Sequence, residues 1–132
     1  MKTTKIRDLM TRDIISVNFN DSVDKIALLM TEKRIGSVLV YDTNDFIGII
    51  TKRDMLERVL LDCLNPCKIL AKDIVTKNII TISDQEIVTT CLKMMYKHKI
   101  KRIPVINSEE GKIIGIITSY DIIAAFNSLD LL

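Results

Sequence analysis

The feature of this sequence that most constrains its fold is an internal repeat. Residues 7–41 match residues 72–106 at a constant offset, and after a short insertion residues 47–51 reappear as residues 114–118. The second pair of segments reads Ile-Gly-Ile-Ile-Thr in both copies. Matched positions elsewhere also carry the same side chain, as in Asp8 and Asp73, Thr11 and Thr76, Ile15 and Ile80, and Met30 and Met95. We therefore expect two copies of one structural unit.

Both copies predict the same order of secondary structure. A short apolar strand precedes a helix whose apolar residues recur every three or four positions. Two β-rich runs separated by a polar turn follow, and a last helix closes each copy. The order strand, helix, strand, strand, helix indicates an α+β fold of two such units. The predicted strands are residues 14–17, 37–41 and 46–51 in the first copy, and 79–82, 103–106 and 112–118 in the second.

Periodicity also predicts which face of each helix is buried. In the first helix of each copy the core side holds Val23, Ile26, Ala27 and Met30, and then Val88, Cys91, Leu92 and Met95. In the last helix it holds Met55, Leu56, Val59 and Leu60, and then Ile122, Ile123 and Phe126. Asn18 with Asp21, and Ser83 with Glu86, have the spacing of a capping box and are predicted to open the first helices.

Residues 62–69 are predicted to link the two copies. Pro66 interrupts the helical pattern there, because proline lacks the N–H group that a continuing helix would use. The sequence thus predicts a first domain at residues 1–61 and a second at residues 70–132. Since a unit of about 60 residues is marginally stable alone, we expect the two domains to pack face to face.

The charge balance and the hydropathy exclude several classes of protein. The 19 basic and 17 acidic residues leave a net charge of +2, so no overall field favours nucleic acid or an anionic membrane. The first residues lack the apolar run of a secretory signal, and no stretch is long enough to span a bilayer. We expect a cytoplasmic protein without a nucleic-acid or membrane partner.

The cysteines and the histidine predict neither a metal site nor a catalytic centre. Cys63 and Cys67 do not have zinc-ribbon spacing, and no second Cys or His pair completes a tetrahedral site. Cys91 falls on a predicted apolar helix face, which indicates a small buried hydrophobic residue. His98 is the only histidine and has no matching nucleophile. We expect reduced thiols, no metal and no enzymatic activity.

The motif with the most chemical content is Gly-Ile-Ile-Thr-x-x-Asp, which ends at Asp54 and again at Asp121. It lies where a strand is predicted to meet a helix, whose N-terminus attracts phosphate. The threonine could add a donor, the aspartate could accept from both hydroxyls of a ribose, and the glycine would let a ligand approach the backbone. Thr-x-x-Asp is also an ordinary helix-capping pattern. The motif alone leaves both interpretations open.

As a whole, the repeat resembles the cystathionine-β-synthase (CBS) domain family. Both copies open with Asp, two apolar residues and Thr, at residues 8–11 and 73–76, and both close with Gly-x-x-Thr-x-x-Asp. The second copy contains Ile103-Pro104-Val105, where the first has Leu39 in place of the proline. The resemblance implies a pseudo-twofold pair of CBS domains with two clefts. In such proteins these clefts commonly bind AMP, ADP, ATP or S-adenosylmethionine.

The resemblance assigns two sets of residues to these clefts. One cleft would hold Thr11, Ile15, Ser16, Ile35, Ser37, Thr118, Ser119 and Asp121. The other would hold Thr76, Ile80, Thr81, Ile100, Arg102, Thr51, Lys52, Arg53 and Asp54. Because the second set is basic and charge-assisted hydrogen bonds to phosphate are strong, we expect AMP, ADP or ATP to prefer it. The Asp121 cleft is expected to be weaker, empty or suited to a less negative adenosyl ligand.

Two functions follow from the resemblance. The first is a regulatory module that binds an adenine nucleotide or an adenosyl ligand and signals to a separate effector protein. The ligand is then a regulator, and no catalytic cofactor is expected. The second is a structural dimerisation or adaptor protein whose clefts are vestigial. The resemblance also implies a homodimer formed through helices, with residues 55–61 and 122–132 as candidate surfaces.

Overall fold

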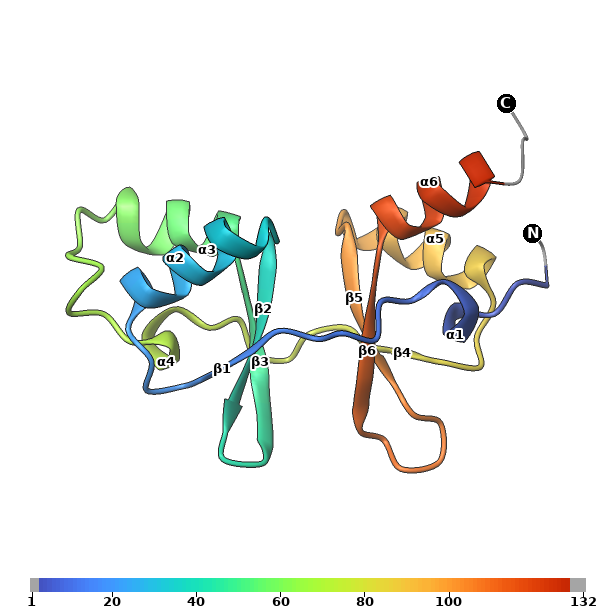
Figure 1. Ribbon diagram of the computed structural model, residues 1–132, viewed down its shortest axis with the longest axis horizontal. Coiled ribbons are helices and arrows are strands. Elements are labelled where there is room, and N and C mark those ends of the chain that lie inside the picture. Colours follow the sequence, from blue (N-terminus) through green and yellow to red (C-terminus); the bar gives the residue numbers. More distant parts are fainter. Residues whose placement is uncertain (1–2, 129–132) are drawn as a thin grey trace. The chain divides into compact units, whose positions relative to one another are not determined.

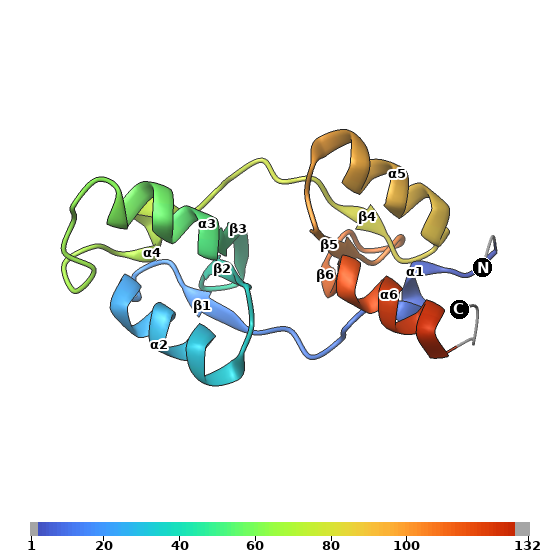
Figure 2. The same ribbon diagram turned by 90° about the horizontal axis from the view of Figure 1, so that it is seen from above.

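Two three-stranded sheets form the framework of the protein, one from each copy of the repeat (Figure 1). The computed structural model describes residues 3–128. The chain divides into two compact units, Ile15–Ile79 and Met1–Ile14 with Ile80–Leu132. We call them the first and the second unit. In each unit helices cover one face of the sheet (Figures 1 and 2). The predicted α+β class is confirmed.

The first unit contains the sheet β1-β2-β3. β1 pairs parallel with β2, and β2 pairs antiparallel with β3. A parallel pair needs a crossover connection, and helix α2 supplies it between β1 and β2. The elements are β1 (Ser16–Asn18), α2 (Val23–Lys33), β2 (Ser37–Asp42), β3 (Asp45–Thr51), α3 (Lys52–Met55), the π-helical turn η1 (Leu56–Leu60) and α4 (Ala71–Ile74).

The second unit repeats this topology with the sheet β4-β5-β6. Here β4 pairs parallel with β5, α5 is the crossover helix, and β5 pairs antiparallel with β6. The last helix, α6, is regular where the first unit has a π-helical turn. The elements are α1 (Ile6–Leu9), β4 (Ile82–Ser83), α5 (Val88–His98), β5 (Arg102–Ile106), β6 (Ile113–Thr118) and α6 (Ser119–Ser128).

Each unit has its own aliphatic core between the sheet and its helices. The first core is made of Val17, Val23, Ile26, Met30, Val38, Val40, Ile50, Val59, Ala71, Ile74 and Val75. The second is made of Ile6, Met10, Ile82, Val88, Cys91, Met95, Ile103, Val105, Ile117 and Ile122. Burial raises the pKa of the Cys91 thiol to about 11. Cys91 is fully buried in the second core, as the helical pattern predicts.

The opening segment of each repeat joins the core of the unit built by the other repeat. Helix α1 begins the first repeat but belongs to the second unit, where Thr11 and Ile116 exchange backbone hydrogen bonds of 2.8 and 2.9 Å. Helix α4 begins the second repeat but belongs to the first unit, where Thr76 and Ile49 exchange bonds of 2.9 and 3.1 Å. The compact units therefore have different boundaries from the sequence domains 1–61 and 70–132.

The starts of the crossover helices differ from the prediction. Neither N-cap residue, Ser22 for α2 or Ile87 for α5, makes a side-chain capping bond. Backbone carbonyls satisfy the first N–H groups instead, as where Val23 N donates to Ile69 O at 2.8 Å and Val88 N to Thr4 O at 2.8 Å. The capping boxes predicted at Asn18–Asp21 and Ser83–Glu86 are wrong, because these polar residues form the turns before the helices.

Part of the predicted burial of the last helices is also wrong. Val59 and Ile122 lie in the cores, and Met55 and Phe126 pack against them. Leu56 and Leu60, however, are 53% and 66% exposed, and Ile123 is 63% exposed. In the crossover helix α5, Leu92 was also predicted to be buried, but it is 40% exposed. Among residues 3–128, no helix is long and apolar enough to cross a membrane.

Candidate functional site

Strand β3 ends at Thr51, which is the N-cap residue of helix α3, and Asp54 lies in the first turn of that helix. Thr51 has an extended backbone, so its side chain and its N–H group both face the helix start. Asp54 N donates to Thr51 Oγ1 at 3.3 Å, and Thr51 N donates to Asp54 Oδ2 at 2.8 Å. These reciprocal bonds are a capping box. The capping interpretation of the motif is therefore confirmed for Thr51 and Asp54.

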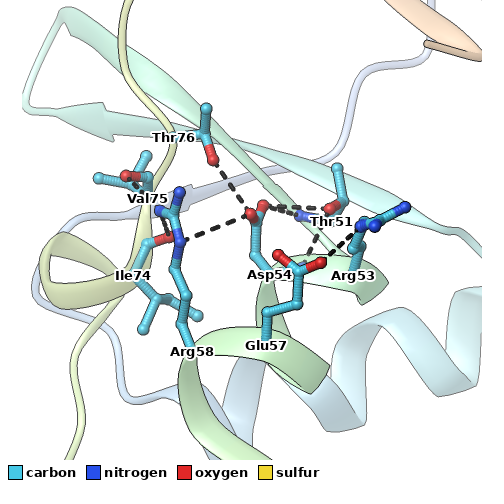
Figure 3. A network of polar contacts seen from close by, with 8 residues as sticks. All are labelled: Thr51, Arg53, Asp54, Glu57, Arg58, Ile74, Val75 and Thr76. Carbon is cyan, nitrogen blue, oxygen red and sulfur yellow. Dashed lines mark hydrogen bonds and ion pairs between the residues drawn. The ribbon is translucent and has the colours of Figure 1, made fainter. Parts of the chain in front are cut away.

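Asp54 also takes part in contacts that a capping box does not need. Its Oδ2 accepts from Thr51 Oγ1 at 3.1 Å, and its Oδ1 accepts from Thr76 Oγ1 at 3.0 Å. Asp54 is only 8% exposed, and it is the one charged residue in the described part of the chain that is buried. A buried carboxylate is stable only with such donors around it. Thr51, Asp54 and Thr76 thus form one cluster, which we call the Asp54 half-site (Figure 3).

Arg58, which the sequence analysis missed, completes this half-site. Its Nη1 donates to the carbonyl oxygens of Ile74 at 2.7 Å and Val75 at 3.2 Å, and its Nε lies 3.9 Å from Asp54 Oδ1 (Figure 3). These two carbonyl oxygens have no partner within the helix, because α4 ends at Ile74, and they can therefore accept from Arg58. Arg58 therefore ties the segment that carries Thr76 to the carboxylate. Its i,i+4 spacing from Asp54 was the available signal.

Lys52 and Arg53, the basic residues of the motif, lie on the exposed side of α3. Arg53 Nε is 2.6 Å from Glu57 Oε1, and this hydrogen bond raises the pKa of Arg53. Figure 3 shows Arg53 and Glu57 paired beside the Asp54 cluster. Part of the positive charge that the sequence assigned to this site is therefore compensated by Glu57.

The second unit contains an equivalent cluster, which we call the Asp121 half-site. Thr118 N donates to Asp121 Oδ2 at 2.9 Å, and Asp121 N donates to Thr118 Oγ1 at 3.1 Å. Thr11 Oγ1 donates to Asp121 Oδ1 at 3.2 Å. Asp121 is partly exposed, so this carboxylate is more accessible than that of Asp54.

The glycines of the motif have a structural role that differs from the one expected. A Cβ on Gly48 would lie 2.1 Å from Thr76 O, and one on Gly115 would lie 2.8 Å from Thr11 O. The space beside each glycine is therefore filled by the opening segment that pairs with the strand. The expectation that glycine admits a ligand to the backbone is wrong at both positions, because protein backbone occupies that space.

The remaining residues of the two predicted sets lie at strand entrances. Ile15, Ser16, Ile35 and Ser37 belong to the first unit, whereas Ile80, Thr81, Ile100 and Arg102 belong to the second, with Ser119 opening α6. Arg102 is partly buried at the start of β5, opposite Thr118 of β6, and burial lowers its pKa. Among residues 3–128, no group of three or more His, Cys, Asp or Glu residues could hold a metal ion.

Comparison with protein families matches the CBS domain to residues 6–61 and to residues 71–128. An uncharacterised protein of Methanopyrus kandleri is 34% identical over 124 residues, which are 93% of this chain and 63% of that protein. The inosine-5′-monophosphate dehydrogenase of Korarchaeum cryptofilum is 32% identical over 118 residues, 89% of this chain and 23% of the enzyme. This chain thus spans less than two thirds of the length of these relatives.

Solved structures resemble the whole chain. A protein with CBS domains from Burkholderia ambifaria has a TM-score of 0.90 at 27% identity and covers 98% of both chains. A conserved protein from Pyrococcus horikoshii has a TM-score of 0.87 at 32% identity, over 95% of this chain and 93% of that one. A CBS domain pair solved in complex with 5′-methylthioadenosine and S-adenosyl-L-methionine has a TM-score of 0.83 at 26% identity, over 97% and 99%.

Proposed function

Because the chain belongs to the CBS-domain family and carries two CBS domains, we propose that it is a regulatory module that binds adenosine ligands at Asp54 and Asp121. The candidate ligands are AMP, ADP, ATP and S-adenosylmethionine. Ligand binding shifts the module between conformations, and an effector protein reads the change. A ligand can shift such an equilibrium only through different affinity for the two states. The module works in the cytoplasm, where Cys63, Cys67 and Cys91 remain free thiols.

The observation that carries this proposal is the repeated pair of a threonine hydroxyl and an aspartate carboxylate from different segments. Thr76 meets Asp54, and Thr11 meets Asp121, in addition to the capping bonds. A carboxylate has about four acceptor positions, and threonine hydroxyls rotate between donating and accepting. Each cluster can therefore rearrange to accept both hydroxyls of a ribose. A cap alone would not need the second threonine.

The CBS domain pair that was solved with two adenosyl compounds gives this proposal its ligand class. 5′-Methylthioadenosine and S-adenosylmethionine share an adenosine with AMP and ATP, and they differ in what is attached to the 5′ carbon. A half-site that recognises ribose through a carboxylate would serve all of these ligands. The 5′ substituent would then decide which ligand binds more tightly.

A thermal-shift screen of the intact protein tests the proposal. AMP, ADP, ATP, S-adenosylmethionine and 5′-methylthioadenosine are compared with inosine monophosphate and with free phosphate. A ligand at about 100 times its Kd stabilises the folded state by ~2.7 kcal/mol, which gives a clear rise in Tm. We expect at least one adenosine ligand, and not free phosphate, to give this rise. The absence of a shift with every adenosine ligand would favour the adaptor function instead.

The exposed helical residues support a second proposal, that the module forms a homodimer. Leu56, Leu60 and Leu61 are 53%, 66% and 72% exposed on and after η1. Exposed apolar clusters mark protein contact sites. Light scattering over a range of concentrations tests the proposal, with Leu60→Glu as the variant and Lys68→Glu, an exposed charge change, as the control. A dimer that Leu60→Glu alone dissociates is expected, whereas a monomer at every concentration would contradict it.

A further inference from the structure

The two half-sites differ in one fixed positive charge. In the first unit Arg58 follows Asp54 by one helical turn, and its guanidinium is held by two carbonyl oxygens, 2.7 and 3.2 Å away. At the matching position of the second repeat the residue is Ala125. No cation within 4.0 Å of the Asp121 carboxylate is present among the described residues. Besides the deeper burial of Asp54, this charge is therefore the main difference between two clusters that make matching Thr–Asp hydrogen bonds.

The position of Arg58 is set by the backbone and not by the carboxylate alone. The orphan carbonyls of Ile74 and Val75 at the end of α4 hold Nη1, and this leaves Nε 3.9 Å from Asp54 Oδ1. Arg58 also lies in the π-helical turn η1, whereas the second repeat continues as the regular helix α6. π-helical turns inside helices are frequent at functional sites. Figure 3 shows the guanidinium between the carboxylate and the two carbonyls.

An arginine held beside a carboxylate changes the affinity of the site for ligands of different charge. The Asp54 half-site pairs one negative with one positive group, so a phosphate on the bound adenosine meets no net repulsion from it. The Asp121 carboxylate keeps its negative charge, which repels phosphate and attracts a cation such as a sulfonium. The exposed Arg53 contributes less to this difference, because it is already paired with Glu57 at 2.6 Å.

We infer that Arg58 sets the ligand charge preference of the Asp54 half-site, so that this site takes nucleoside phosphates and the Asp121 half-site takes neutral or cationic adenosyl ligands. This inference rests on the proposed function and deepens it. Arg58 acts as a specificity-determining residue through the electrostatic field beside the carboxylate. Arg53, one of the basic residues from which the sequence predicted the same preference, is then secondary.

Calorimetric titration of the intact protein with AMP and with 5′-methylthioadenosine tests the inference. The two ligands share their adenosine, so the ratio of their Kd values isolates the effect of charge. It also cancels any loss of folded protein that a substitution causes. Asp121→Asn is used as the background, which leaves the Asp54 half-site intact. Arg58→Gln removes the charge, and Arg58→Lys keeps it with a different shape.

We expect Arg58→Gln to lower the preference for AMP over 5′-methylthioadenosine by about fivefold, as befits a partly exposed charge, and Arg58→Lys to retain most of it. In the opposite background, Asp54→Asn, the variant Ala125→Arg is expected to raise the preference for AMP. Equal weakening of both ligands by Arg58→Gln would overturn the inference and leave a structural role only. If the unsubstituted protein binds neither ligand, the proposed function fails as well.

Discussion

The hydroxyl of Thr76 donates a hydrogen bond of 3.0 Å to Oδ1 of Asp54, and so joins the opening of the second repeat to the closing motif of the first. The bond lies inside the first unit, because Thr76, which follows α4, belongs to Ile15–Ile79. Thr11 makes the equivalent bond to Asp121 at 3.2 Å in the second unit. Each unit is thus completed by a segment from the other repeat, at the residue where we propose that ligand binds.

Replacing Thr76 by valine should destabilise the first unit measurably. The substitution preserves the side-chain shape but leaves the buried carboxylate with one donor fewer, at a cost of about 1–2 kcal/mol. Thr11→Val is the matched control, and its cost should be under about 1 kcal/mol because Thr11 and Asp121 are more exposed. Urea unfolding followed by circular dichroism measures both. Equal costs would contradict the difference in burial between the two half-sites.

Alanine substitutions at Gly48, Gly115 and Gly111 should lower the free energy of unfolding by amounts that decrease in that order. Gly48→Ala places a Cβ 2.1 Å from Thr76 O, where only backbone movement gives relief, and should cost about 3 kcal/mol or more. Gly115→Ala should cost less, since its nearest backbone atom is 2.8 Å away and Met10 can shift. A Cβ on Gly111 would have no atom within 4 Å, so Gly111→Ala should cost only the strain of a φ of +70°, about 1 kcal/mol of stability. Unfolding in urea gives the order, and a Gly111→Ala cost equal to that of Gly48→Ala would refute this account of the motif.

Ile6 should report on the second unit, although it begins the first repeat. Its side chain is fully buried in the core with Ile103 and Ile117, so Ile6→Ala should cost about 2–5 kcal/mol. Amide chemical-shift changes should concentrate in residues 82–122. Arg7→Ala, which alters an exposed side chain of the same helix, should have little effect. Shift changes centred on residues 15–61 would show that α1 belongs to the other unit.

The three thiols should react in two classes. Cys63 and Cys67 are exposed and should react within seconds with Ellman's reagent at pH 8, whereas Cys91 should react only as the second unit unfolds. Burial raises the pKa of Cys91 to about 11 from about 8.5 in the unfolded chain. Its contribution to stability is therefore complete below about pH 8.5 and is lost as the pH rises towards 11. Three fast thiols in the folded protein would contradict the buried position.

The repeat predicted the element order and the Thr-Asp motif because side-chain periodicity and turn residues are local signals. It could not predict which unit each opening segment joins, since both copies carry the same pattern and either would accept the segment. The exposure of Leu60 escaped prediction for another reason. Leu61 N bonds to Leu56 O, five residues back, so the π-helical turn rotates the following side chains away from the α-helical pattern. A lone arginine on a helix is usually solvated, so the i,i+4 spacing of Arg58 from Asp54 did not by itself predict its bonds to the carbonyl oxygens of Ile74 and Val75.

The most direct test of the central claim is calorimetric titration of AMP into the intact protein and into the variants Asp54→Asn, Asp121→Asn and their combination. Asparagine keeps the side-chain volume but cannot accept from both ribose hydroxyls with two charged oxygens. We predict that Asp54→Asn weakens AMP binding about tenfold or more, a change of about 1.4 kcal/mol. Asp121→Asn should have a smaller effect, and the double variant should abolish binding. Equal losses in the single variants, or AMP binding that survives in the double variant, would contradict the account.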